Sequence, residues 1–477
     1  MQVSKVFNPI SFGADSTGAA DSSDAIVNTI NAAFQAQKGK ELLPGINDLG
    51  GAVVDLQGGN YKISKPIRLP SGGGNVVIRG GTLRAADKFP TDGYLIELHS
   101  PSSDKADKKK RGFYYEDITF RDILFDSGFR GGGLLVIDSA RIRVDNCFFI
   151  HFGTEGIHVK SGHETFVSST FLGQHVNIGG DPDEKSFSGT AINLASNDNA
   201  VTDVVIFSAG TGIILSGQAN ILTGDPVQVH VTNAFFLGDA NVVLKSVKGV
   251  ISGLTIVDNM FSGSSNAKAV VEVQGTFNQV DQVVIDRNNV RGMSVKSTTA
   301  KLTVVGKADK WVADFSPILL FPDRIKNVQY SLYVNGKKSI PLHAVTSTSN
   351  NKVVVEADRV VDGGVSVSVD QYSNPVKCWT VARKLAASVL SKMMGDLLEA
   401  LVRRRGGLDT RPPAPACMAP AETATDECPK HDAVRDCSCS TLCTPSRSAG
   451  LEVASLVAMG RKRERARKRR WVGVVYI

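Results

Sequence analysis

The segment Asn146-Cys147-Phe148-Phe149 contains the pattern that decides the fold: a polar residue, one spacer and a bulky apolar residue, placed directly after a strand-forming run. The pattern recurs at Asp122-Ile123-Leu124, Ser169-Thr170-Phe171, Asp203-Val204-Val205, Asn233-Ala234-Phe235, Asn259-Met260-Phe261 and Asn288-Asn289-Val290. Successive copies lie 24, 23, 34, 30, 26 and 29 residues apart. A repeat of this period indicates a solenoid in which each repeat forms one coil.

A second short apolar run recurs in step with the first. It falls at residues 134–137, 157–160, 191–194, 213–216, 242–245 and 270–273, each after glycine or a small polar turn. Two or three short strands per repeat, without helices long enough for crossovers, predict an all-β fold in which the coils stack as a parallel β-helix. Stacking would align Phe148, Phe171, Phe235 and Phe261 as an internal aromatic ladder. An antiparallel sandwich is the alternative, but two-residue hairpin turns are rare here.

The two ends of the repeat region differ from it. Residues 25–34 carry apolar side chains on one helical face after Asp and Ser caps, which predicts a helix covering the first coil. Residues 302–377 alternate as strands and predict a small β subdomain or a cap on the last coil. We therefore expect a β-helix with its helical cap over 1–301, this β region over 302–377, and a separate tail over 378–477.

The tail differs from the rest in charge and in cysteine content. Eight basic residues and one acidic residue within 461–470 supply the whole net charge of +7, so the other residues sum to zero. This balance argues against nucleic acid as a partner of the main domain. Six of the seven cysteines lie at or after Cys378, and we expect the seventh, Cys147, to be a buried thiol. We expect the tail to be disordered and to arise from an imperfect gene model.

Several motifs resemble a known family. Phe12-Gly13-Ala14-Asp15-Ser16-Thr17-Gly18 and Gly50-Gly51-Ala52-Val53-Val54 are similar to the start of the pectate-lyase-like superfamily. Phe152-Gly153-Thr154-Glu155-Gly156-Ile157 and Asn197-Asp198-Asn199-Ala200-Val201-Thr202-Asp203 resemble the divergent plant polygalacturonases of the Quartet type. The resemblance covers roughly residues 5–377. It implies a right-handed β-helix of the pectin-lyase type, secreted to the cell wall, that hydrolyses α-1,4-galacturonan with inversion.

The chain departs from the mainstream polygalacturonase pattern in three places. The strings Asn-Thr-Asp, Asp-Asp and Gly-His-Gly are absent, and Gly162-His163-Glu164 is a partial echo of the last. Arg324-Ile325-Lys326 has the same letters as the Arg-Ile-Lys motif of these enzymes, but it lies after the repeats. The join of Gly224 to Asp225 falls where the resembling enzymes have more coils, which predicts a shortened active-site wall and puts activity in question.

Hydrolysis of a glycosidic bond normally needs two carboxyl groups, which on a β-helix must project outward from neighbouring coils. The 34-residue interval after Ser169 is the longest, and surplus length leaves a solenoid as a loop. The predicted catalytic residues in and around this loop are Asp181, Asp183, Glu184, Asp198 and His163. The predicted substrate-binding residues are Glu155, His158, Lys160, Glu164 and Lys185. The alternatives are solvated loop acids, turn capping by Asp198 and ordinary surface charge.

These observations predict a polygalacturonase-like hydrolase acting on pectic polysaccharide. The alternatives are a non-catalytic carbohydrate-binding β-helix and a pectate or rhamnogalacturonan lyase. No cofactor or metal is expected, because no carboxylate spacing fixes a calcium site. No apolar run is long enough for a membrane span, and no export signal precedes the first motif of the chain as given. We expect a monomer outside the cell.

Overall fold

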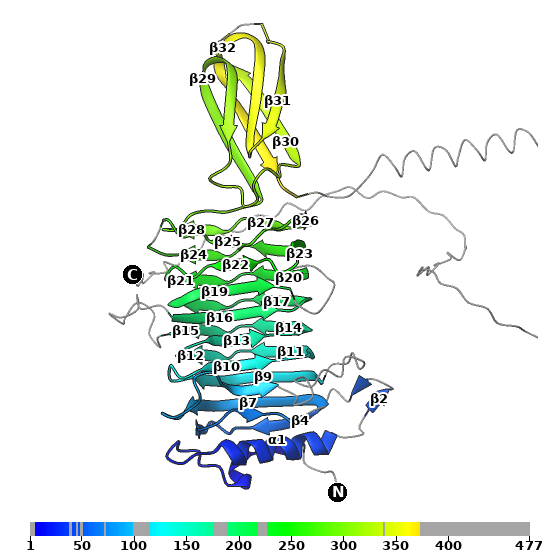
Figure 1. Cartoon of the computed structure of the whole chain (residues 1–477), viewed down its shortest axis with the longest axis vertical. Coiled ribbons are helices and arrows are strands. Elements are labelled where there is room, and N and C mark those ends of the chain that lie inside the picture. The colour runs from blue at the N-terminus through cyan, green and yellow to red at the C-terminus, as the bar shows by residue number, and fades with distance from the viewer. Residues whose placement is uncertain are drawn as a thin grey trace, which may run out of the picture. The chain divides into compact units, whose positions relative to one another are not determined.

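The computed structural model describes residues 5–37, 41–43, 46–47, 51–70, 73–98, 114–174, 188–217, 227–264, 266–336 and 339–372. Predicted site residues Asp181, Asp183, Glu184 and Lys185, the Gly224–Asp225 join and the tail 378–477 lie outside these ranges. Within the described ranges the chain forms parallel coils (Figure 1), as the sequence predicts. Two parallel sheets make up the coils, one of 18 strands and one of eight among the described residues.

The eight-stranded sheet contains the second strand of each coil. Its strands are β6 (Ile67–Arg68), β8 (Tyr94–Leu98), β10 (Gly132–Val136), β13 (Glu155–Val159), β16 (Ser188–Ala195), β19 (Ala209–Ser216), β22 (Val242–Lys245) and β25 (Val271–Gln274). Each strand pairs in register with the next: Leu134 faces Ile157, which faces Ile192. These three are fully buried, whereas the residues that follow them point away from the core. The sheet therefore presents an outward row with one side chain per coil.

The 18-stranded sheet contains the remaining strands of each coil. Its strands are β1 (Val6–Phe7), β4 (Ala52–Asp55), β5 (Asn60–Ile63), β7 (Gly73–Ala85), β9 (Tyr115–Asp126), β11 (Ser139–Asp145), β12 (Phe148–Ile150), β14 (Gly162–Ser168), β15 (Phe171–Gly173), β17 (Asn199–Thr202), β18 (Val205–Phe207), β20 (Val227–Thr232), β21 (Phe235–Leu237), β23 (Val250–Val257), β24 (Met260–Ser262), β26 (Gln279–Asp281), β27 (Val284–Asp286) and β28 (Asn289–Arg291). A further antiparallel pair is β2 (Glu41–Leu43) with β3 (Ile46–Asn47). The strand pairings within the 18-stranded sheet are parallel, so the sandwich alternative is wrong.

The aromatic ladder exists, but three of its four predicted members are wrong. Phe148 pairs with Phe171, and the row to which they belong faces outward; Phe171 is 39% exposed and Phe235 38% exposed. The inward row is one residue further along. Its buried members are Phe125, Phe149, Leu172, Ile206, Phe236 and Phe261. Only Phe261 was assigned correctly, because adjacent bulky residues leave the choice between the two faces open.

Left-handed residues form the corner at which the repeat pattern begins. Asn146, Ser169 and Asn233 all have φ near +50°, as do the equivalent residues of other coils. The corner falls at Asp258 and Arg287 in the last coils, one residue before the Asn259 and Asn288 expected from the pattern. Asn259 instead turns inward, and its buried side chain bonds to the Asn288 amide oxygen and the Val231 carbonyl. The repeat is thus confirmed, and its register is shifted by one residue in the last coils.

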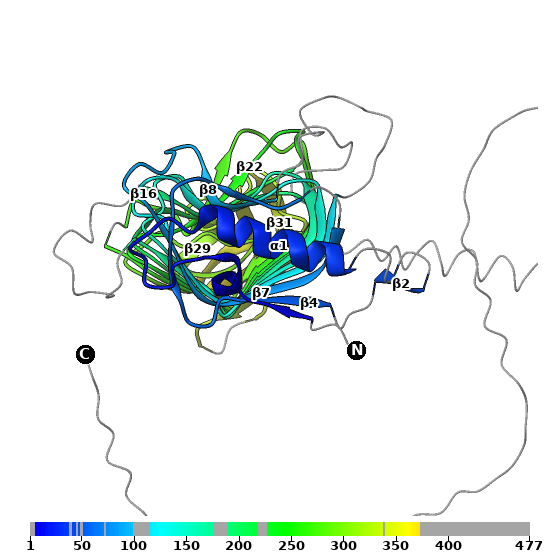
Figure 2. The same ribbon diagram turned by 90° about the horizontal axis from the view of Figure 1, so that it is seen from below.

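Helix α1 (Ser23–Gln37) packs on the first coil, as predicted (Figure 2). Its residues Ile26, Ile30, Ala33 and Phe34 belong to the same hydrophobic cluster as the coil interior. The Asp21 carboxylate accepts hydrogen bonds from the backbone and hydroxyl of Ser23, which satisfies free donors at the start of the helix. A short 3₁₀ helix, η1 (Pro9–Phe12), precedes it.

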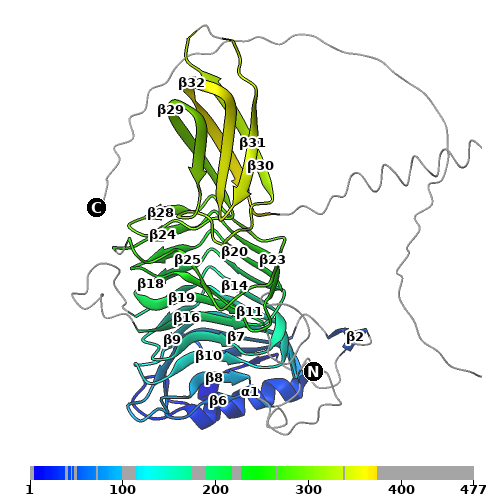
Figure 3. The same cartoon turned by 45° about the horizontal axis from the view of Figure 1, so that its top comes forward.

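The coils stack without interruption on both sides of the Gly224–Asp225 join. Strand β20, which begins after it, pairs with β17 and with β23. Strand β19, which ends before it, pairs with β22. The stack therefore has no break at this place, since consecutive coils remain in register (Figure 3).

The strands after the coils form an antiparallel sheet of four strands within the described residues. They are β29 (Thr299–Asp314), β30 (Asn327–Val334), β31 (His343–Ser349) and β32 (Lys352–Asp370). The longest of them, β32, pairs with the other three. Trp311, Phe315 and Val365 are among the buried residues of its own core. The division of the chain at residues 301 and 377 stays a proposal.

Candidate active site

A cluster of ionisable side chains lies on the eight-stranded sheet. The Tyr94 hydroxyl donates to Glu155 Oε2 at 2.6 Å and lies 3.0 Å from His158 Nδ1. The Asn193 amide donates to Glu155 Oε1 at 3.3 Å. These residues come from β8, β13 and β16, so the stacking of coils brings together groups up to 99 positions apart in the chain. We call Tyr94, Glu155, His158 and Asn193, together with Glu97, the Glu155 cluster.

A glycine makes room for the tyrosine that links the cluster. Strand β10 lies between β8 and β13, and its residue Gly132 pairs with Tyr94. A Cβ atom at Gly132 would lie 2.3 Å from the Tyr94 ring. Since such an approach is impossible, only glycine lets the ring cross this strand toward Glu155.

Glu97 fixes the other end of the cluster. Its carboxylate accepts a hydrogen bond from Arg68 Nε at 2.8 Å and from the Tyr94 backbone N–H at 3.2 Å. The Glu97 side chain is 7% exposed, whereas those of Glu155 and His158 are each 20% exposed. Glu97 therefore positions Tyr94, and Glu155 is the cluster carboxylate that a ligand can reach.

Burial changes the ionisation of two members of the cluster. Burial lowers the pKa of His158, against the opposing pull of the Glu155 charge, and the nearby Lys160 lowers it further. Burial and the hydrogen bond to Glu155 raise the pKa of Tyr94. The neutral imidazole and the neutral phenol are thus both favoured. An uncharged, polar surrounding of a half-buried carboxylate is a setting typical of acid and base catalysis.

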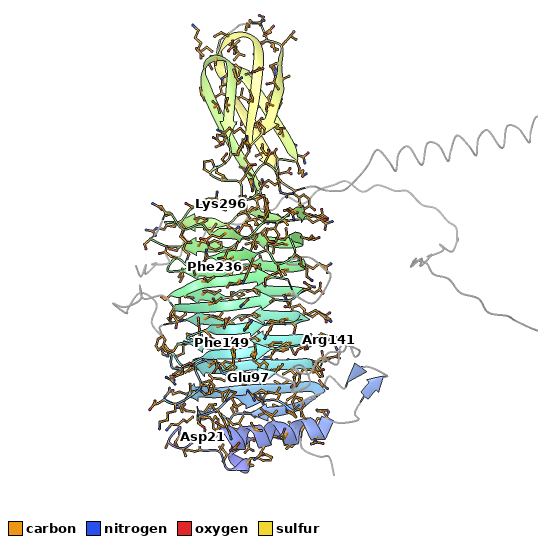
Figure 4. The ribbon with its side chains drawn as sticks, viewed as in Figure 1. Asp21, Glu97, Arg141, Phe149, Phe236 and Lys296 are labelled. Atoms are coloured by element: carbon orange, nitrogen blue, oxygen red, sulfur yellow. The ribbon has the colours of Figure 1, made fainter. Side chains whose placement is uncertain are left out.

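The predicted residues His163 and Glu164 lie on β14 of the 18-stranded sheet. The Arg141 guanidinium bonds to Asp117 at 2.9 Å and to Glu116 at 2.7 Å, and it lies 3.8 Å from Glu164. His163 Nδ1 lies 3.2 Å from Glu164 Oε2. Arg141 stands at the edge of the stack in Figure 4, away from Glu97. The hydrogen bonds of Arg141 therefore go to Asp117 and Glu116, and Glu164 lies beside it at ion-pair distance.

Asp198 belongs to a second column of left-handed residues. Asp117, Arg141, Glu164 and Asp198 have φ between 54° and 58° and occupy equivalent places in successive coils. Their left-handed backbone conformation bends the chain at the same position of each coil. Asp198 and Glu164 therefore stand beside each other in the fold and apart from the Glu155 cluster.

The structure thus divides the predicted residues into two groups. Glu155 and His158 contact each other, with Lys160 following on the same strand end; His163, Glu164 and Asp198 do not join them. Sequence reasoning missed Tyr94, Glu97 and Asn193. No motif marks these residues, and simple alternation would place Tyr94 and Glu97, three positions apart, on opposite faces of the strand.

Arg324 has a structural role. Its guanidinium donates to the backbone carbonyls of Phe277 and Asn278 at 2.7 and 2.9 Å. It therefore ties the segment after β29 to the last coils. This agrees with the interpretation of Arg324-Ile325-Lys326 as a match by letter only.

Within the described ranges no three His, Cys, Asp or Glu side chains converge on a position that could hold a metal ion. The helices of the same ranges are too short or too polar to cross a membrane. Cys147 is buried as expected, and burial raises the pKa of its thiol to about 12.

The fold and the Glu155 cluster define a parallel β-helix with an ionisable site on one outward sheet face. No protein-family model matches the chain. Over 412 residues it is 48% identical to polygalacturonase QRT3 of Arabidopsis thaliana, a match that covers 77% of this chain and 84% of the relative. The chain therefore belongs to the family of this Quartet-type polygalacturonase.

Solved structures resemble the chain more distantly. The surface adhesin PfbA of Streptococcus pneumoniae matches 61% of this chain and 74% of its own with 15% identity and a TM-score of 0.41. A tailspike mutant of E. coli bacteriophage HK620, solved with a pentasaccharide, matches 77% of this chain and 93% of its own with 9% identity and a TM-score of 0.36. The fold assignment rests on the strand pairing described above.

Proposed function

We propose that the chain is a glycoside hydrolase that cleaves α-1,4-galacturonan in the plant cell wall. The observation that carries the proposal is the half-buried Glu155, held by Tyr94 and Asn193 on the outward face of the eight-stranded sheet. The family to which the chain belongs supports the substrate class. In this proposal the chain acts outside the cell, as a monomer, on pectic polysaccharide.

Glu155 is the first of the two carboxyl groups that glycoside hydrolysis requires. We assign the second to the loop 175–187, which contains Asp181, Asp183 and Glu184. The ends of that loop support this choice: the Gln174 amide donates to the carbonyls of Phe152 and Ser188. Two residues beyond Ser188, Thr190 pairs with Glu155. The described residues that flank this segment, Gln174 and Ser188, therefore lie close to the cluster.

The neighbours of Glu155 have supporting roles in the proposed reaction. Glu97 and Arg68 hold the Tyr94 backbone, and the Tyr94 hydroxyl fixes the orientation of the Glu155 carboxyl group. A neutral His158 can hydrogen-bond to a sugar hydroxyl without adding charge beside the carboxyl group. Lys160, exposed at the end of β13, can pair with a galacturonate carboxylate. Lys185 stays a candidate for the same role.

The first experiment measures reducing ends released from polygalacturonic acid by the full chain and by Glu155→Gln. Loss of a general acid or base typically costs 10²- to 10⁴-fold in rate. We expect a loss of kcat in this range with KM nearly unchanged, because glutamine keeps the hydrogen bond from Tyr94. Asp181→Asn, Asp183→Asn and Glu184→Gln identify the second carboxyl group by the same measure.

Glu272→Gln is the matched control, since Glu272 lies on β25 of the same sheet, several coils beyond the cluster. Full activity of this variant and loss in Glu155→Gln would support the assignment. Product absorbing in the ultraviolet, abolished by a chelator, would indicate a lyase. Retained binding of polygalacturonic acid without cleavage by the unaltered chain would show a non-catalytic carbohydrate-binding protein and overturn the hydrolase.

A further inference from the structure

A second surface of the β-helix contains a hollow that the proposed reaction does not use. It has a volume of about 340 Å³ and is lined by Gln228, His230, Gly253, Thr255, Gln282, Val284 and Tyr372. We call it the Gln228 hollow. Its volume is at the lower end of the range for small-molecule sites, so it can hold one or two sugar units.

The register of the 18-stranded sheet builds this hollow. His230 pairs with Thr255, and Thr255 pairs with Val284, so one outward side chain per coil forms the floor. Gln228, Gly253 and Gln282 belong to the column of left-handed bends, with φ of 52°, 68° and 51°. Since Gly253 has no side chain, a space opens between the two glutamines.

Several polar side chains that line the hollow are available to hydrogen-bond to a ligand. Along the same column Arg141 forms ion pairs with Asp117 and with Glu164. The side chains of Gln228, His230 and Gln282, in contrast, make no hydrogen bond or ion pair to other described residues. Amides offer both donors and acceptors, which is what a ligand rich in hydroxyl groups requires.

The remaining lining supports a sugar over other ligands. The Tyr372 ring offers an apolar face with a polar end, and Val284 adds an apolar contact in the floor. Among the described residues, none of those that line the hollow is Lys or Arg. A uronate carboxylate would therefore lose water there without gaining a cationic partner, which is unfavourable.

From this chemistry we propose that the Gln228 hollow binds a neutral sugar unit of a polysaccharide. It is an accessory site on the 18-stranded sheet, separate from the Glu155 cluster on the eight-stranded sheet. The proposal is independent of hydrolysis, because binding at the hollow needs none of the residues assigned to the reaction.

Two probes that differ only at C6 test the ligand class: α-1,4-linked galactobiose and α-1,4-linked digalacturonate. Histidine-selective isotope labelling of the full chain lets NMR follow both surfaces, with His230 reporting on the hollow and His158 on the cluster. Assignments come from His230→Gln and His158→Gln. We expect galactobiose to shift the His230 signal in a saturable manner, and digalacturonate to shift His158 and leave His230 in place.

Two variants test the lining. Tyr372→Ala and Gln282→Ala should each weaken galactobiose binding at least tenfold. Tyr333→Ala, at an exposed tyrosine of β30, is the matched control and should bind as the unaltered chain does. A His230 signal that does not move at tens of millimolar galactobiose would overturn the site. So would galactobiose binding by both lining variants that is as strong as binding by the unaltered chain. A His230 shift as large with digalacturonate as with galactobiose would show that the hollow does not select a neutral sugar.

Discussion

At the scale of single residues, coil stacking sets the chemistry of side chains that local sequence leaves ordinary. The alternating pattern of its strand predicts that His158 is exposed. Its side chain is only 20% exposed, because Tyr94 of β8 lies against it. Burial then lowers the pKa of the imidazole although Glu155 stands beside it. The charged form of His158 is therefore disfavoured in the folded protein.

This pKa predicts a pH dependence of stability. The unfolded chain has a histidine pKa of about 6.5, and the folded pKa of His158 lies below it. Between the two values the unfolded state binds more protons, so stability falls as the pH drops from about 7 toward the folded pKa. Urea unfolding of the unaltered chain and His158→Gln at pH 7.5 and pH 5.5 measures this. The stability advantage of histidine should shrink at pH 5.5; a constant difference would contradict the assigned direction.

At the scale of elements, the inward and the outward side chains of each strand contribute unequally to stability. Phe125 and Phe149 stack in parallel inside the coils with ring centroids 4.4 Å apart, as do Phe236 and Phe261. Phe148 and Phe171 stack similarly on the outer face, but there they keep contact with water. Only the inner row loses its hydration completely on folding. Figure 4 marks Phe149 and Phe236 within the stack.

The inner row therefore dominates stability. Truncation of a buried phenylalanine costs about 3–5 kcal/mol because a cavity remains. We expect Phe149→Ala to lower the free energy of unfolding by this amount. Phe171→Ala, in the outer row of the adjacent coil, should cost well under half as much. Equal losses in chemical denaturation would place both rings in the core and contradict the register described here.

The left-handed corners give a second prediction for elements. Asn233 has φ of 52° and an exposed side chain. A residue other than glycine, asparagine or aspartate pays about 1–2 kcal/mol in this conformation. Asn233→Val should therefore lower stability by about that amount, whereas Asn233→Gly should leave it close to the unaltered value. Thermal unfolding followed by circular dichroism compares the two; equal stability would argue against a strained corner.

At the scale of the whole described chain, a single hydrophobic cluster runs from Ala14 through the coils to Phe321. Neighbouring coils support each other, and each end must be covered because it would otherwise expose core and unpaired strand edges. Helix α1 covers the first coil through Ile26, Ile30 and Phe34. The stability of this end thus depends on a helix of 15 residues.

Opening this cap should promote association. Ile30 is fully buried against the coils, and a glutamate there would be a buried, unpaired charge. We expect Ile30→Glu to form dimers or larger species at concentrations where the unaltered chain keeps its size. Gln35→Glu, on the exposed face of the same helix, adds the same charge and should have no effect. Light scattering after size-exclusion chromatography measures both; unchanged size of Ile30→Glu would show that the cap is dispensable.

The sequence by itself determined the repeat, the second strand of each coil, the capping helix and the family. These follow from local patterns: alternation, turn residues and motifs survive in any window of the chain. It also indicated Glu155 and His158. It left open which face each bulky residue takes, since Phe148 and Phe149 are chemically the same and a shift of one residue exchanges the two faces.

Only the tertiary structure decided the composition of the site. Tyr94 and Glu155 are 61 positions apart, and their contact exists because β8, β10 and β13 stack in register across Gly132. The same stacking separates Glu155 from Glu164, which is close in sequence but lies on the other sheet. Spacing along the chain determines which residues are neighbours within one coil. Contacts between coils also depend on the length of each loop, because residues in a loop do not take part in the stack.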